Sequence, residues 1–214
     1  MERKYYKMTI AGIERALPIC PISDKLMIAG FVIFGDPELT TACAEELLAR
    51  APEYDYIISA EAKGIPLAHE MARLAGNQKY ILARKAPKLY MTGIFESKVR
   101  SITTAKEQTL YLDTADAEIM KGKRILIVDD VISTGESLRA LEELVAKAGG
   151  MICGKMTILA EGDACKREDI TYLEELPLFD KYDEYLPEEL VRKGFAHGVL
   201  DINGLKEAVV SWTM

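Results

Sequence analysis

The apolar positions of the chain fall into helical stripes and short continuous runs that alternate along the sequence. A helix is predicted to begin at Asp36 and Pro37, which suit an N-cap and a first helical position, and to end before Pro52. Its apolar residues recur at helical spacing, at Leu39, Ala42, Cys43, Leu47 and Leu48. Further helices are predicted over 66–74 and from Gly135 to the pair Gly149 and Gly150.

Five short segments between these helices are typical of strands. They cover residues 54–59, 79–83, 108–113, 124–130 and 156–160. Strands that alternate with helices predict βαβ units, and therefore an α/β fold whose mostly parallel sheet is covered by helices on both faces.

Three stretches carry a weaker pattern. Residues 1–35 read as irregular chain or short strands, because Pro18 and Pro21 break any long element. Residues 90–122 are the least regular part of the chain apart from the strand at 108–113. From about Glu175 the sequence becomes acidic and rich in tyrosine, and its role is not indicated by the pattern.

Composition excludes several classes of protein. The chain has 214 residues and a net charge of -7, so it is a poor general nucleic-acid binder. Its longest apolar run, 26–34, is far shorter than the roughly 20 residues of a membrane span, and no secretory signal opens the chain. Four cysteines without a CxxC pair favour a cytoplasmic protein with reduced thiols, and two distant histidines argue against a histidine zinc site.

The strongest chemical signal lies at residues 128–137. The strand at 124–130 ends in Asp129 and Asp130, which places two carboxylates at the carboxyl edge of a parallel sheet, where open α/β folds bind ligands. The turn that follows begins a helix and offers a phosphate cradle of N–H groups and hydroxyls, from Ser133, Thr134, Gly135, Glu136 (through its backbone N–H) and Ser137. The two acids suit the hydroxyls of an attached sugar or magnesium-bound water, so the motif indicates one ligand with a phosphate and a ribose diol.

This segment resembles the motif with which type I phosphoribosyltransferases bind 5-phosphoribosyl-1-pyrophosphate (PRPP). The resemblance implies the type I phosphoribosyltransferase fold. It also implies three parts: a small N-terminal hood over residues 1–35, the phosphoribosyltransferase core over 36–179, and a C-terminal extension of unknown role over 180–214.

Two further segments resemble the adenine branch of this family. Adenine phosphoribosyltransferases carry Glu-Ala-Arg-Gly in a pyrophosphate-binding loop that can contain a non-proline cis peptide, and this chain has Glu61, Ala62, Lys63 and Gly64 there. Lysine keeps the positive charge but loses the bidentate fork of arginine. Residues 84–89 match the branch's Arg-Lys-x-x-Lys-Leu, which implies that Lys85 and Lys88 bind pyrophosphate. Taken alone, each segment is an ordinary charged loop.

The resemblance also implies a loop over residues 91–108 that closes on the reacting centre and excludes water. Counting back from Asp129 places Glu107 near the glutamate that adenine enzymes use close to the base, so Glu107 is expected to be catalytic; the alternative is a plain surface charge. Residues 99–103 are instead similar to xanthine phosphoribosyltransferases. The implied reaction converts adenine and PRPP to AMP and pyrophosphate, with xanthine or another 6-oxopurine as the alternative base.

The same resemblance implies a Mg²⁺-dependent homodimeric enzyme of purine salvage. Asp129 and Asp130 are expected to act in catalysis by orienting the ribose hydroxyls. The metal is expected to be held by PRPP and water near them, without direct side-chain ligation. A PRPP-sensing regulator would need a DNA-binding domain, and residues 1–35 are neither basic nor patterned as a helix-turn-helix. An orotate enzyme is disfavoured by the loop at 84–89.

Overall fold

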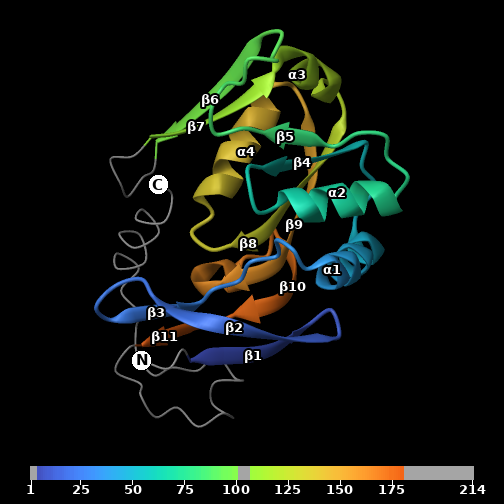
Figure 1. Cartoon of the computed structure of the whole chain (residues 1–214). Helices are drawn as coiled ribbons and strands as arrows, with labels where there is room; N and C mark the ends of the chain where they lie inside the picture. Colours follow the sequence, from blue (N-terminus) through green and yellow to red (C-terminus); the bar gives the residue numbers. More distant parts are fainter. Residues whose placement is uncertain (1–3, 101–106, 181–214) are drawn as a thin grey trace.

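A five-stranded parallel sheet forms the centre of the protein (Figure 1). The structure is a computed structural model that describes residues 4–100 and 107–180. The strand order is β10-β9-β8-β4-β5. The strands are β4 (Tyr56–Ala60), β5 (Ile81–Ala83), β8 (Arg124–Ile132), β9 (Met151–Glu161) and β10 (Thr171–Leu176). All four pairings between neighbours are parallel, which confirms the predicted sheet.

Helices cover both faces of this sheet, as predicted. Helices α1 (Pro37–Arg50) and α2 (Ile65–Leu74) pack into one apolar cluster, which also contains Leu126 and Val128 of β8. Helices α3 (Thr114–Met120) and α4 (Glu136–Lys147) supply the cluster on the opposite face, with Ile125 and Ile127. The side chains of β8 therefore alternate between two cores, and its continuous apolar run reflects burial on both sides.

The N-terminal residues form an antiparallel sheet, which we call the hood sheet. Its strands are β1 (Tyr5–Ile10), β2 (Ile13–Pro21), β3 (Leu26–Ala29) and β11 (Leu178–Asp180), in the order β1-β2-β3-β11. The last strand comes from the far end of the core and pairs with β3. The ring of Phe179 packs edge-on against Tyr6, with 5.5 Å between ring centroids, and both rings belong to the same apolar cluster as α1. The hood sheet and the core are thus joined by one continuous hydrophobic interior.

Residues 90–122 contain more regular structure than the sequence predicts. Strands β6 (Ile94–Arg100) and β7 (Glu107–Asp113) form an antiparallel ribbon, and α3 follows directly. Strand β6 escaped prediction because it carries Glu96, Ser97 and Lys98 in its centre, so its apolar pattern is interrupted. Of the expected C-terminal extension at 180–214, only Asp180 lies within the described residues. Among the helices that the structure describes, none is long and apolar enough to cross a membrane.

The strand order places a switch point between β4 and β8. From β4 the chain proceeds through α2 to β5 on one side, and β8 occupies the other side of β4. Loops that leave the carboxyl ends of two such strands diverge in opposite directions and leave room for a ligand between them. The predicted motif at 61–64 follows β4, and the motif at 129–137 comprises the last residues of β8 and the loop after it, so the topology brings the two motifs to this position.

The start of α1 is fixed by a charged N-cap. The Asp36 carboxylate accepts a hydrogen bond from the Leu39 N–H at 3.1 Å and forms an ion pair with Arg15 of β2, whose Nε lies 2.6 Å away. The Arg15 guanidinium lowers the pKa of Asp36 below its ordinary value. Because Arg15 belongs to the hood sheet, this contact also ties the hood sheet to the core.

We predict that Asp36→Ala lowers the free energy of unfolding by about 1–2 kcal/mol at pH 7, because an N-cap and an ion pair are both lost. A carboxyl whose folded pKa is lowered contributes stability above its unfolded pKa of about 3.9 and loses it as pH falls through the folded value. The difference between the two proteins should therefore shrink in urea unfolding at about pH 2–3. Asp36→Asn keeps an acceptor for Leu39 without the charge, so its cost should be smaller. Its dependence on pH should match that of Asp36→Ala, because only the wild-type carboxyl titrates at this position. An Asp36→Ala cost that grows on acidification would contradict this account.

Candidate active site

The two carboxylates at the end of β8 lie in different environments. Asp130 is buried, with 3% of its surface exposed, and its Oδ2 lies 3.2 Å from Lys63 Nζ. Asp129 is half-buried, and its Oδ1 accepts a hydrogen bond from the Asp130 N–H at 2.9 Å. Burial and the neighbouring Asp130 carboxylate raise the pKa of Asp129 well above its ordinary value. Two adjacent acids are thus held at the sheet edge, and the positive charge of Lys63 partly offsets the free-energy cost of their burial and mutual repulsion.

The loop between β4 and α2 folds directly over these acids. A Cβ atom on Gly64 would lie 2.3 Å from the Ser59 hydroxyl and 2.9 Å from Asp129 Oδ1, so only glycine fits at this position without a shift of its neighbours. The peptide bond between Glu61 and Ala62 is cis, a feature that the family resemblance allows for this loop. Lys63 is exposed and reaches from this loop to Asp130, while Ala62 is exposed beside it.

Glu61 connects the same loop to the basic segment that follows β5. Its carboxylate accepts a hydrogen bond from the Lys85 N–H at 3.1 Å and pairs with Arg84 Nη2 at 3.1 Å. The Nζ of Lys88 lies 4.0 Å from the same carboxylate. The Lys85 side chain is exposed, and the Arg84 backbone forms a two-way bridge to Tyr111 of β7. The structure therefore brings the two predicted pyrophosphate segments together, with Glu61 as the link.

The loop at 133–137 forms the start of α4. Gly135 is the N-cap of this helix and has a left-handed backbone with φ 75°, a conformation that favours glycine. Glycine has no side chain to accept hydrogen bonds from the first N–H groups of the helix, so the positive end of α4 is presented at the loop. Thr134 is exposed, and its hydroxyl lies 3.5 Å from the Glu136 N–H. Ser133, Glu136 and Ser137 are half-buried around the same turn.

Glu161, at the end of β9, is a buried acid that the sequence analysis missed. Burial raises its pKa, and the Ser133 hydroxyl and Lys63 oppose the shift. It lies beyond the predicted strand at 156–160, so the rule that ligands collect at strand ends could have drawn attention to it. Ser59, at the end of β4, was also missed; its buried hydroxyl lies under Gly64.

Glu107 is the one predicted site residue that the structure leaves unplaced. Its backbone begins β7 and pairs with Arg100 of β6, but its side chain lies outside the part of the chain that the structure describes. The other predicted residues converge on the carboxyl ends of β4, β5 and β8.

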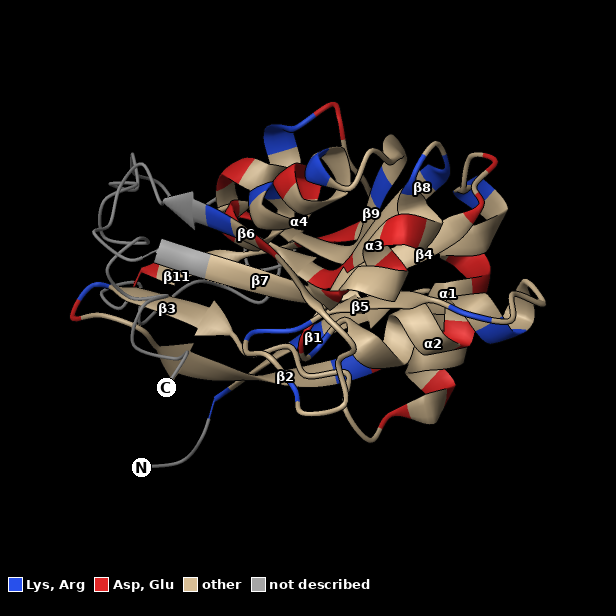
Figure 2. Ribbon diagram, turned by 90° about the horizontal axis from the view of Figure 1, so that it is seen from above, with Lys and Arg blue, Asp and Glu red and all other residues tan. Residues whose placement is uncertain are grey.

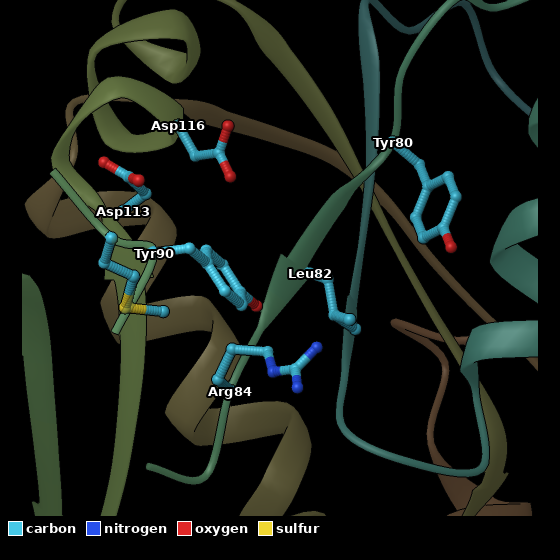
Figure 3. A pocket seen from close by; sticks show the side chains of 7 residues that line it. Tyr80, Leu82, Arg84, Tyr90, Asp113 and Asp116 are labelled. Atoms are coloured by element: carbon cyan, nitrogen blue, oxygen red, sulfur yellow. The ribbon is translucent and has the colours of Figure 1, made fainter. Parts of the chain in front are cut away.

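A cavity of about 200 Å³ lies on the outer side of β5, between Tyr80, Leu82, Arg84, Tyr90 and Asp113 (Figure 3). None of the predicted site residues whose side chains the structure describes lines it. It therefore does not coincide with the carboxylates and the phosphate loop.

Charge in the rest of the described molecule is mixed rather than segregated. Helix α4, for example, carries acidic and basic residues along its length (Figure 2). Local charge at the sheet edge, rather than a general field, therefore governs what the site can bind.

The acids at the sheet edge fit a magnesium ion that is held mainly by its ligand. The described residues contain no group of three or more histidine, cysteine or acidic side chains able to hold a metal by themselves. Asp129 and Asp130 present carboxylate oxygens that would hold such an ion through its bound water, while phosphate groups of the ligand would bind it directly.

Comparisons with known proteins agree with this geometry. The model of the phosphoribosyl transferase domain matches residues 40–177. Adenine phosphoribosyltransferase of Bifidobacterium longum is 33% identical over 149 residues, which cover 68% of this chain and 74% of that protein. Hypoxanthine/guanine phosphoribosyltransferase of Methanocella paludicola is 32% identical, covering 72% and 74%. Xanthine phosphoribosyltransferase of Bacillus licheniformis is 29% identical, covering 64% and 71%.

Among solved structures, adenine phosphoribosyltransferase of Rhodothermus marinus superimposes with a TM-score of 0.58 at 22% identity. The match covers 80% of this chain and 94% of that one. This likeness shows the shared fold, and the family model covers well over half of the chain. The motif at 128–137, the parallel sheet and these matches lead to one conclusion: the chain belongs to the phosphoribosyltransferase family.

Proposed function

We propose that this protein transfers the 5-phosphoribosyl group of PRPP to a purine base, with adenine as the leading candidate. One observation carries the proposal. Two carboxylates, a helix N-terminus and two loops with exposed lysines meet at the switch point of one parallel sheet. These groups match the three polar parts of PRPP, namely the ribose diol, the 5′-phosphate and the pyrophosphate.

Each group has a distinct task in this mechanism. The loop at 133–137 holds the 5′-phosphate through its N–H groups and hydroxyls, and Asp129 and Asp130 accept hydrogen bonds from the ribose hydroxyls. Ala62, Lys63 and Gly64 receive the pyrophosphate, with Lys85 and Lys88 on its other side. Glu61 would contribute through its backbone, because its carboxylate is engaged by the basic segment.

The reaction needs positioning and charge rather than a covalent intermediate. A purine nitrogen attacks C1′ while the bond to pyrophosphate breaks, and the lysines balance the negative charge that grows on the leaving group. Mg²⁺, when bound beside Asp129 and Asp130, would neutralise part of the same charge. Lys63 also forms an ion pair with Asp130, so PRPP must compete with that carboxylate for the lysine.

The choice of base rests on sequence similarity to related enzymes. Segments 61–64 and 84–89 resemble adenine enzymes, but both are expected to contact PRPP and not the base. Residues 99–103 resemble xanthine enzymes, and relatives of similar identity are named for adenine, for hypoxanthine and guanine, and for xanthine. A 6-oxopurine enzyme is therefore the alternative. A regulator that senses PRPP without chemistry is the alternative of another class.

Three further features belong to the proposal. Glu107 acts near the base from the loop that closes the site. The protein works as a homodimer, which sedimentation at micromolar concentration would detect. It acts in the cytoplasm, as the composition and the four cysteines without CxxC pairs favour.

We predict that the double variant Asp129→Asn, Asp130→Asn loses about 100-fold or more in turnover and binds PRPP with Mg²⁺ more weakly, because both acceptors for the ribose diol lose their charge. Its melting temperature should stay the same or rise, since two adjacent carboxylates, one buried and one half-buried, destabilise the folded protein. Asp163→Asn is the matched control, an exposed acid that pairs with Lys166. Calorimetry that finds unchanged PRPP affinity in the double variant would remove these acids from the site.

A panel of bases tests the reaction itself. The protein with PRPP and Mg²⁺ is mixed separately with adenine, hypoxanthine, guanine, xanthine or orotate, and nucleotide and pyrophosphate are measured. Adenine presents an amino donor at position 6 and the oxopurines a carbonyl acceptor, so discrimination of about 10⁴-fold is expected. Adenine turnover far above the rest supports the proposal, and Glu107→Gln should then lower kcat more than it changes the KM for PRPP. A preference for xanthine changes the base and keeps the mechanism. Tight PRPP binding without turnover on any base favours the regulator.

A further inference from the structure

Arg167 lies against the loop that begins α4, although it is 30 residues away in sequence from the end of that loop at Ser137. It follows the short helical turn η1 (Gly162–Lys166), which leaves the carboxyl end of β9. A Cβ atom on Gly135 would lie 2.9 Å from Arg167 Nη1. Figure 1 shows this turn in orange below the start of α4. The guanidinium is therefore in contact with the proposed 5′-phosphate loop.

The carboxylate of Asp169 fixes the orientation of this guanidinium. Arg167 Nε donates to Asp169 Oδ1 at 2.8 Å, and Nη2 donates to Asp169 Oδ2 at 2.7 Å. Because the bidentate pair uses Nε and Nη2, it leaves Nη1 as the group that faces Gly135. About a third of the Arg167 side chain is exposed, so this arginine is not sealed in the interior.

Asp169 is itself held in place. Its Oδ2 also accepts a hydrogen bond from Lys155 of β9 at 2.7 Å, and Lys155 pairs with Glu142 of α4. The chain of contacts therefore begins and ends on α4, which carries the phosphate loop at its N-terminus. These contacts hold the Arg167 guanidinium in position beside the loop.

The charges around the loop explain why an additional cation would favour phosphate binding there. Asp129, Asp130 and Glu161 gather at the neighbouring strand ends, and Glu136 lies in the loop itself. A phosphate group brings about −1.5 to −2 charges into this acidic surrounding. The N-terminus of α4 offers only about half a positive charge, and Lys63 is paired with Asp130. Arg167 adds a cation that stays charged at any physiological pH, and Asp169, which balances part of that charge, is shared with Lys155.

We propose that Arg167 is a further ligand of the 5′-phosphate, with Nη1 donating to a phosphate oxygen held by the loop at 133–137. The inference rests on the proposed function, since it assumes that this loop binds the phosphate of a phosphoribosyl ligand. It adds a side-chain cation from outside the sequence motif to a subsite otherwise built from N–H groups and hydroxyls.

Calorimetry with ribose 5-phosphate and with magnesium pyrophosphate separates a role in 5′-phosphate binding from a role in pyrophosphate binding. Ribose 5-phosphate carries the 5′-phosphate without pyrophosphate, so Arg167→Met should weaken its binding about 10- to 100-fold, with a similar loss for PRPP. Pyrophosphate affinity should not change. Arg167→Lys keeps the charge but not the bidentate pair with Asp169, so its loss should be intermediate. Lys166→Met is the matched control, a neighbouring exposed lysine that pairs with Asp163, and it should leave all three affinities unchanged.

The outcomes distinguish this inference from the function on which it rests. Wild-type turnover of PRPP combined with unchanged ribose 5-phosphate affinity in Arg167→Met would overturn the role of Arg167 alone. Equal losses for ribose 5-phosphate and pyrophosphate, or a falling melting temperature that accounts for the loss, would show that Arg167 only supports the fold. If Arg167→Met does not fold, Arg167→Lys decides, because a structural role predicts no selective loss for ribose 5-phosphate. A wild-type protein that binds neither ribose 5-phosphate nor PRPP would refute the proposed function and this inference together.

Discussion

The site depends on two adjacent carboxylates at the end of a strand that is buried on both faces. Strand β8 can deliver Asp129 and Asp130 to the sheet edge only because its preceding residues anchor it in two apolar cores. Like charges so close to a low-dielectric interior repel each other, and the surroundings must compensate. Lys63 lies beside Asp130, and Gly64 lets the neighbouring backbone pass directly over Asp129. The conformation of the loop at 61–64 is therefore tied to the acids at the end of β8.

The same principle organises the other loops at this edge. Glu61 pairs with Arg84 and Lys88 and accepts from the backbone N–H of Lys85, and Asp169 holds Arg167 and Lys155. In each case one acid fixes two or more basic residues that would otherwise repel one another. Cations that are oriented before a ligand arrives lose less conformational entropy when it binds, which favours tight binding of a highly charged molecule.

The sequence was informative wherever the pattern was local. The apolar run of β8, the stripe of α1 and the small residues after Asp130 each predicted their own element. Contacts between segments that are distant in the sequence could not be predicted. The residues around Glu61 do not indicate its partners after β5, and Arg167 lies far along the chain from the phosphate motif that it contacts. Strand β6 and helix α3 were missed because the first is polar in its centre and the second is only 7 residues long. Glu161 was not predicted because the apolar run of β9 ends at Ala160, so the sequence pattern leaves the acid outside the strand.

The pairing of β11 with β3 affects how the chain folds during synthesis. Strand β3 lies near the N-terminus, while its partner is the last strand of the described chain. During synthesis the edge of β3 stays without its partner until the whole core has left the ribosome, because its complement is made last. An unpaired edge of this kind can bind other extended chains. The hood sheet therefore cannot be completed before the core has been synthesised, and until then the edge of β3 is open to association with other chains.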